Sequence, residues 1–207
     1  MVESANSSFG SSSSRGGGST KYLSPSQIEA EINQIAKGYL ERFDELSVVL
    51  DERGYQVRKD AINGCPVVVI KCRAEGLTPE MAAPLIENPA SIVTKMNNKM
   101  TVDRLEDGAE GGNLMYHFAI ETPTIAVSNR SMFVRYYIQR DSDSGCVTIT
   151  SGSRGLEEVE ASYTSLSQNN VVGDLILSYM RLEPFDNGYN IEQVSCFDPK
   201  GWIPGFI

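Results

Sequence analysis

The sequence predicts an α+β domain whose sheet is mainly antiparallel. Three observations carry this prediction: one long amphipathic helix near the start, strand-like segments with alternating side chains after it, and turn dipeptides between those segments. Because the helical and strand-like segments are segregated instead of alternating, a parallel α/β sheet is not expected. A sheet of this length must also curve to cover its apolar face.

The first element is a helix over residues 22–46. Ser24 and Gln27 have the spacing of a capping box, and Pro25 suits the first helical position. Apolar residues then recur every three or four positions, which places them on one face of a helix. These residues are Ile28, Ile32, Ile35, Tyr39, Leu40, Phe43 and Leu46.

Strands follow this helix. The segment "LSVVLDERGYQVRKDAI" predicts a hairpin around residues 52–54, and Asn63-Gly64 is a strong turn signal before the strand "PVVVIKCRAE". Next, "TPEMAAPLIENPAS" predicts one or two short helices, with Thr78 as a cap. The remaining strands are expected over 99–106, 113–122, 131–140, 145–153, 173–185 and 189–197. Between them, "EEVEA" at 157–161 is expected to be a solvated strand edge or a loop.

Composition defines the domain and its class. Residues 1–20 are rich in serine and glycine, which predicts a disordered tail, and residues 21–207 form one domain. Of the 207 residues, 41% are hydrophobic and 22% are charged, as in ordinary globular proteins. The formal net charge of −9 repels nucleic-acid phosphates, so we expect no nucleic-acid partner.

Several classes of site are not expected. The four cysteines form no C-x-x-C pair and have no histidine close by, which favours reduced structural thiols over a metal site. No P-loop or dinucleotide-binding glycine pattern is present, and we expect no cofactor. No apolar run is long enough to span a membrane, and the N-terminus lacks the pattern of a secretory signal. Together these features predict a cytoplasmic protein.

Two segments resemble the START (StAR-related lipid transfer) domain family. One is "TPTIAVSNRSMFVRYY" at 122–137, with a Ser-Asn-Arg turn before an aromatic strand. The other is the chain end, which is similar to an Asp-Pro-x-Gly-x-Ile-Pro ending at Asp198–Pro204. The resemblance covers roughly residues 25–207. It implies a helix-grip fold, a curved and mainly antiparallel sheet wrapped around a helix. The C-terminal gripping helix is apparently missing after Ile207, as in a truncated protein.

The family resemblance also implies a function. It predicts a non-catalytic lipid-binding protein that holds a single phospholipid, sterol or other lipid in an internal apolar tunnel, either for transfer between membranes or for lipid sensing. Its partners would be the lipid and, transiently, a membrane surface. Two alternatives stay open: an enzyme on the same scaffold acting on a hydrophobic substrate, and an interaction module without a ligand.

Candidate lipid-binding residues come from two strands and the final turn. Tyr116, Phe118 and Ile120 share one face of a strand, and Phe133 and Arg135 share one face of the next. Alternation alone leaves open which face of each strand is inward. Trp202 follows the last strand and is a candidate for the tunnel mouth.

Three polar residues of this region could have either a structural or a functional role. Arg130, in the Ser-Asn-Arg turn, is expected to fix a loop. The family resemblance implies a second arginine six residues after this turn in many members, and in sterol-binding members this arginine pairs with a buried acid. Arg135 lies five residues after Arg130, and a shift of one residue moves a strand side chain to the opposite face. His117 is the single histidine, and we expect a structural role for it.

Overall fold

The computed structural model describes residues 23–90, 99–105, 113–122 and 127–201. The predicted tail at 1–20 and the candidate Trp202 lie outside the described residues.

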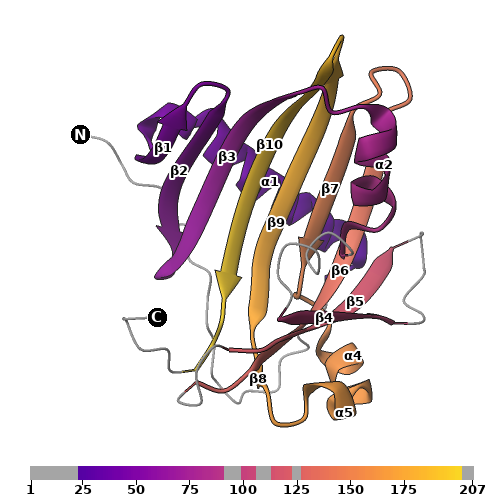
Figure 1. The fold of residues 1–207 in the computed structure, drawn as a ribbon. Coiled ribbons are helices and arrows are strands. Elements are labelled where there is room, and N and C mark those ends of the chain that lie inside the picture. Colours follow the sequence, from indigo (N-terminus) through magenta and orange to yellow (C-terminus); the bar gives the residue numbers. More distant parts are fainter. Residues whose placement is uncertain (1–22, 91–98, 106–112, 123–126, 202–207) are drawn as a thin grey trace.

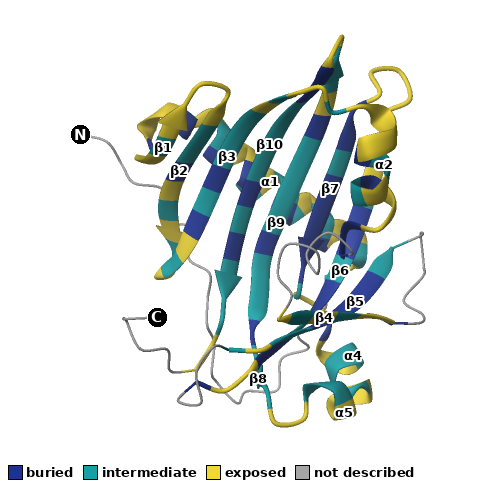
Figure 2. Cartoon of the chain, viewed as in Figure 1, coloured by how far each residue is buried: buried dark blue, intermediate teal, exposed yellow. Residues whose placement is uncertain are grey.

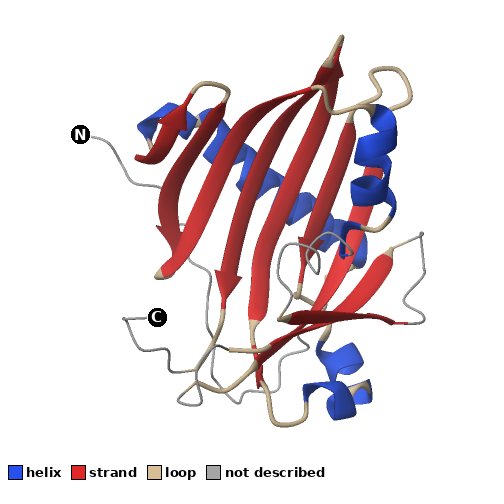
Figure 3. Ribbon diagram, viewed as in Figure 1, coloured by secondary structure: helices blue, strands red, loops and turns tan. Residues whose placement is uncertain are grey.

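One long helix precedes the strands, and the shorter helices lie between groups of consecutive strands (Figure 3). The helices are α1 (Pro25–Glu41), the short 3₁₀ helix η1 (Phe43–Glu45), α2 (Pro79–Glu87), α4 (Glu157–Ser162) and α5 (Thr164–Ser167). The first strands are β1 (Ser47–Glu52), β2 (Tyr55–Ile62), β3 (Cys65–Glu75), β4 (Met100–Leu105) and β5 (Leu114–Ile120). The later strands are β6 (Arg130–Arg140), β7 (Val147–Gly152), β8 (Val171–Val172), β9 (Asp174–Phe185) and β10 (Gly188–Asp198).

The described strands form one open sheet in the order β1-β2-β3-β10-β9-β7-β6-β5-β4, with β8 beside β6. All neighbouring pairs on the main path are antiparallel, and the short β8 pairs with β6 in parallel. The centre of the sheet joins β3 to β10, which are far apart in sequence. This architecture confirms the predicted α+β class with a mainly antiparallel sheet.

Local signals explain the first elements. The side chain of Ser24 accepts a hydrogen bond from the backbone of Gln27, and the Gln27 side chain accepts one from the backbone of Ser24, so the predicted capping box is present. Asn63 and Gly64 have φ of 50° and 83°, as the tight turn between β2 and β3 requires. Thr78 caps α2 by accepting from the backbone of Met81.

Two predictions of local structure need correction. Residues 157–161 belong to the short helix α4, where a strand edge or loop was expected. Its first residue follows Leu156, whose side chain makes no capping hydrogen bond, so the usual start signal is missing from the sequence. The two-residue strand β8 was also not predicted, since it is too short to show an alternating pattern.

Two faces of the sheet are covered by different helices (Figure 1). The long helix α1 crosses behind the sheet in this view, and its buried residues pack against β3, β9 and β10. We call this side the α1 face. The shorter helix α2 lies on the other side, where Ala82 and Ile86 pack with strand residues, and we call that side the α2 face. On the α1 face, the helices α4 and α5 add a separate cluster with Leu105, Met115 and Phe133.

The two edges of the sheet are β1 and β4. Strand β1 has an irregular register between Val48 and Leu50, consistent with a β-bulge, and it ends in the acidic pair Asp51 and Glu52. Both features hinder pairing with a strand from another molecule, because a bulge breaks the hydrogen-bond ladder and like charges repel.

Candidate functional site

Strand β9, in the middle of the sheet, is mostly intermediate in burial (Figure 2), and several large apolar side chains of the α2 face are only half-buried. In the middle of the sheet, Met180 and Ile191 are half-buried, although both belong to the apolar cluster of this face. The same holds for other members of that cluster, namely Leu114, Met132, Ile138 and Leu175. These large apolar side chains are covered only in part by other protein atoms. An apolar molecule that binds to them leaves water, which lowers the free energy of the system.

Aromatic residues line the β5–β6 part of this face. The ring of Tyr116 meets that of Tyr136 edge to face at 5.6 Å between centroids, and it lies 6.3 Å from the ring of Phe118. The Tyr116 hydroxyl donates a hydrogen bond to the side-chain oxygen of Asn88, 3.1 Å away, beyond the end of α2. Tyr116 thus fixes the end of α2 against the sheet and keeps its ring on the apolar face.

The hydroxyls of Tyr116 and Tyr136 are neutral. Burial raises the pKa of Tyr136 far above its ordinary value, while a hydrogen bond with Ser151 opposes this effect weakly. Burial also raises the pKa of Tyr116, against the lowering effect of nearby Arg104. Both groups therefore act as uncharged hydrogen-bonding groups.

The structure places the predicted site residues on both faces. Tyr116 and Phe118 are buried on the α2 face, 3% and 1% exposed. Ile120 is half-buried, and strand alternation puts it on the same face. Phe133 instead packs on the α1 face, against the cluster under α4 and α5. The five predicted residues that the structure describes are therefore not brought together in one place.

Arg135 also points to the α1 face. Its Nη2 atom lies 3.7 Å from the sulfur of Met115, and its Nε atom has no hydrogen-bond partner within the described ranges. Tyr137, on the same face, feels this guanidinium, which lowers its pKa against the larger raising effect of burial. Arg135 therefore lies on the opposite face from the apolar surface beside α2.

His117 does not form part of a catalytic triad among the described residues. Its Nδ1 atom lies 3.4 Å from a carboxylate oxygen of Asp103, and its ring packs 5.0 Å from that of Phe133. The other ring nitrogen, Nε2, is buried and has no hydrogen-bond partner in the described part of the chain. A base in a Ser-His-Asp arrangement would need a nucleophile at that atom.

Apolar residues of β7, β9 and β10 on the α2 face were not among the lipid-binding residues predicted from the sequence. They belong to the same apolar cluster as Tyr116 and Phe118. They are Val147, Ile149, Met180, Leu182, Tyr189 and Ile191. Their alternation was visible in the predicted strands and could have identified them as one face, but only the fold shows that this face meets Tyr116.

Arg130 holds the turn that follows the last strand. Its Nε donates to the carbonyl oxygen of Pro199 at 2.7 Å and its Nη2 to that of Lys200 at 3.1 Å, while Nη1 donates to the carbonyl of Ser128. The side chain is buried, and these three carbonyls satisfy it. Arg130 therefore has the loop-fixing contacts expected for it, and it joins the start of β6 to the turn after β10.

Lys200 reinforces this turn from its other side. Its Nζ atom lies 2.6 Å from Asp198 and 3.0 Å from Asp174. Hydrogen bonding to these carboxylates raises the pKa of Lys200, and the bond from Lys200 lowers the pKa of Asp198. The segments 128–131, 171–174 and 198–201 thus meet at one point, which we call the C-terminal junction.

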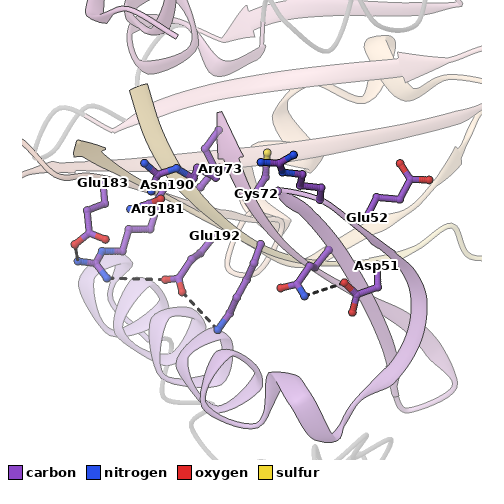
Figure 4. A pocket seen from close by; sticks show the side chains of 13 residues that line it. Asp51, Glu52, Cys72, Arg73, Arg181, Glu183, Asn190 and Glu192 are labelled. Carbon is purple, nitrogen blue, oxygen red and sulfur yellow. Dashed lines mark hydrogen bonds and ion pairs between the residues drawn. The ribbon is translucent and has the colours of Figure 1, made fainter. Parts of the chain in front are cut away.

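A groove of about 600 Å³ is lined by residues of β1, β2, β3, β9 and β10 (Figure 4). Charged side chains dominate it: Arg181 pairs with Glu183 at 3.0 Å and with Glu192 at 3.9 Å, and Lys71 also reaches Glu192 at 3.9 Å. Because these charges neutralise one another and interact with solvent, the groove does not offer the apolar lining that an acyl chain requires.

The described residues include neither a metal-ligand cluster nor a membrane-spanning helix. No three His, Cys, Asp or Glu side chains in these ranges are grouped as metal ligands would be. None of the helices in the described part of the chain has the length and apolar character needed to cross a bilayer.

The architecture is similar to that of several solved structures. Neither a family model nor a curated protein sequence matches this chain. Human StAR-related lipid transfer protein 5 is similar in structure with a TM-score of 0.61 at 12% identity, covering 86% of this chain and 87% of that one. Human STARD10 gives 0.64 at 10% identity, covering 88% of this chain and 71% of the other.

A bacterial structure is similar as well. The STAR-related lipid transfer protein of Xanthomonas axonopodis (fragment 25–204) has a TM-score of 0.56 at 16% identity, over 77% of this chain and 85% of that fragment. At such identities the likeness shows the fold. The chain therefore has a START-like fold, as the resemblance of its C-terminal half predicted.

Proposed function

We propose that this chain binds a single lipid in an internal apolar tunnel on the α2 face, for transfer between membranes or for lipid sensing, without catalysing a reaction. The observation that carries the proposal is the incomplete burial of Met180, Ile191 and the other large apolar side chains of this face. On the opposite side of the same strands, Leu177, Val194 and Cys196 are almost completely buried in the cluster with α1.

The names of the structural neighbours support the proposal. Human StAR-related lipid transfer protein 5 is named for lipid transfer, and the human StarD13 (DLC2) domain is described as a lipid transfer and protein localization domain. The second structure has a TM-score of 0.59 at 15% identity and covers 89% of this chain. We transfer the general activity only, since fold alone does not fix a ligand.

Desolvation supplies the driving force for binding. Each methylene group that leaves water for an apolar lining contributes about 0.8 kcal/mol. For a chain of about ten methylenes this transfer favours binding by roughly 8 kcal/mol of free energy, before the cost of ordering the complex is subtracted. No cofactor or charged anchor is needed for such a site to work.

We propose a cytoplasmic setting, which the state of the cysteines supports. Cys65, Cys72, Cys146 and Cys196 are all free, which suits a reducing compartment such as the cytoplasm. A carrier in that compartment must meet membranes transiently to load and release its lipid. We place no segment of the described chain at that contact.

Lipid analysis of the purified 207-residue chain tests the proposal. The protein is incubated with mixed-lipid vesicles, separated from them and extracted for mass spectrometry, with fluorescence of a bound lipid probe as a second readout. We expect about one lipid per chain. Met180→Gln, which puts a polar group of similar length on the α2 face, should reduce the bound amount several-fold.

A matched control uses the same substitution elsewhere. Met81 is 64% exposed on α2, so Met81→Gln should leave lipid binding unchanged. The proposal is wrong if the chain retains no lipid of any class while remaining folded, or if the two methionine variants bind lipid equally well.

A further inference from the structure

A row of hydroxyl groups crosses the α2 face. The strand registers pair Tyr136 of β6 with Ser151 of β7, Ser151 with Ser178 of β9, and Ser178 with Ser195 of β10. Four neighbouring strands thus each place a hydroxyl residue at the same level. With strands about 4.8 Å apart, the row extends over about 14 Å.

All four side chains point to the α2 face. Tyr136 belongs to the apolar cluster of that face. Ser178 lies between Leu177 and Tyr179, which both pack on the α1 face, so alternation turns Ser178 to the other side. Ser195 is placed in the same way by Val194 and Cys196.

Ser151 follows Thr150, whose hydroxyl donates to Asn33 of α1 at 2.6 Å. The neighbour therefore faces α1, and Ser151 itself faces away from it.

On one side along the strands, the hydroxyl row borders levels of the sheet that are mostly apolar. The next level of the sheet along the strands contains Ile138, Ile149, Met180 and Gln193 in register, and the level beyond it contains Val147, Leu182 and Ile191. Apolar residues are the expected filling of a sheet face that carries no ligand. Adjacent serines on a half-covered face therefore require another explanation.

Two of the hydroxyls have free hydrogen-bonding capacity. Tyr136 and Ser151 bond to each other. Ser178 and Ser195 are half-buried, and neither side chain has a hydrogen-bond partner among residues 23–90, 99–105, 113–122 and 127–201. A hydroxyl both donates and accepts, so these two can bind a hydroxyl or a carbonyl oxygen of a ligand.

Charged residues stand away from the row. Those that share this face by register lie at strand ends or on outer strands, and all except Arg130 are exposed. They are Glu52, Lys59, Arg104, Arg130 and Arg140. Arg130 is already bonded to three carbonyls. Lys59 is at the level of the row but is separated from Ser195 by Val68 of β3.

We infer that the hydroxyl row selects a lipid whose polar group is an uncharged hydroxyl, with Ser178 and Ser195 as its specificity-determining residues; this inference rests on the proposed lipid-binding function. Hydroxyls satisfy the hydrogen bonds of such a group but do not neutralise a phosphate. A charged headgroup moved from water to this part of the sheet would lose its hydration without gaining a counter-charge. Sterols and diacylglycerols have the required chemistry, whereas phospholipids do not.

Competition between lipid classes tests the inference. The purified chain is exposed to vesicles containing equal molar amounts of phosphatidylcholine, phosphatidylserine, a sterol and a diacylglycerol, and the extracted lipid is quantified by mass spectrometry. We expect the two hydroxyl lipids to be enriched at least about tenfold over the two phospholipids, since a charge without a counter-charge is strongly disfavoured in an apolar site.

Serine variants test the assignment to the row. Ser178→Ala and Ser195→Ala should each weaken binding of a fluorescent sterol or diacylglycerol roughly fivefold, as expected for one lost hydrogen bond. The matched control is Ser131→Ala, because Ser131 is a buried strand serine on the opposite face of β6, and its hydroxyl has no partner in the described part of the chain. This control should bind the probe as the unchanged protein does, and thermal unfolding checks that every variant is folded.

The outcomes separate the two proposals. Capture of phosphatidylcholine or phosphatidylserine in preference to the hydroxyl lipids overturns the inference and leaves the lipid-binding function intact. Unchanged affinity in both Ser178→Ala and Ser195→Ala likewise overturns the role of the row. Retention of no lipid class at all contradicts the proposed function itself and the inference with it.

Discussion

The two faces of the sheet differ in how completely the chain covers them. In β3, Val67 and Val69 point to the α1 face and are 0% exposed, whereas their neighbours Val68 and Ile70 point to the α2 face and are only half-buried. Both sets are apolar and belong to the same strand. When both faces of a strand are apolar, its sequence does not show which face is buried more completely. The helices that pack on each face determine that difference.

The largest expected effect compares a core position on each face. Leu177→Ala on the α1 face should lower the free energy of unfolding by about 3 kcal/mol, because the cavity forms in fully packed surroundings. Ile191→Ala on the α2 face should cost about 1 kcal/mol, since its side chain is already partly in solvent. Urea unfolding at pH 7 measures both values. Equal losses would show that the α2 face is as tightly packed as the α1 face.

The second prediction concerns the C-terminal junction at the lower end of the α2 face. Arg130→Ala should destabilise the protein by about 2 kcal/mol, because three carbonyls lose a charged donor. Arg154 provides the matched control: it forms an exposed ion pair with Glu31, and Arg154→Ala should cost less than about 1 kcal/mol. The same urea titration compares them, and similar losses for both arginines would remove the special role of Arg130.

Cysteine alkylation probes the faces without changing the sequence. Cys196 is 1% exposed on the α1 face, and burial raises its pKa to about 11, so at pH 8 it is protonated and shielded. Cys72 is half-buried and pairs with Ile191 on the α2 face. We expect iodoacetamide to modify Cys72 at least about tenfold faster, by peptide mass spectrometry. Bound lipid should slow Cys72 alone, and equal rates in the native protein would contradict the difference between the faces.

The smallest effect is the ion-pair group of the C-terminal junction. Lys200→Met should cost about 0.5 kcal/mol at pH 7, since the lysine and its partners are partly exposed. The folded-state pKa of Asp198 is lowered, so its contribution is present above the ordinary carboxyl pKa and is lost as the pH falls through the folded value. Urea unfolding at pH 7 and pH 3 should therefore show the difference from the unchanged protein shrinking in acid. A loss that grows in acid would exclude this origin.

Local signals in the sequence predicted much of the fold. The capping box of Ser24 and Gln27 marked the start of α1, and Asn63-Gly64 marked the β2–β3 turn. Helix α4 was missed because Glu157, Glu158 and Glu160 are polar and no capping side chain precedes them. In these cases the outcome depended on interactions between residues close in sequence.

The candidate site was predicted only in part, because its faces are fixed by long-range packing. In β5, Tyr116 and His117 are both buried, since α2 covers one side and the cluster under α4 and α5 covers the other. Alternation could not choose between them. The five-residue spacing of Arg130 and Arg135 left the face of Arg135 open, and only the packing of the whole sheet places it on the α1 face. The hydroxyl row was not predicted, since its four members become neighbours only through the registers of β6, β7, β9 and β10.

The pairing of β3 with β10 has a consequence for biosynthesis. Cys72 of β3 pairs with Ile191 of β10, so β3 gains this neighbouring strand only after the long segment between them has been translated. During that interval Val67 and Val69, and the apolar side of α1, lack the β9 and β10 residues that later bury them. Chains whose strands pair over long sequence distances fold slowly and expose apolar surface that can aggregate in the meantime. We therefore expect chaperone supply and a lowered growth temperature to govern the yield of properly folded protein in expression.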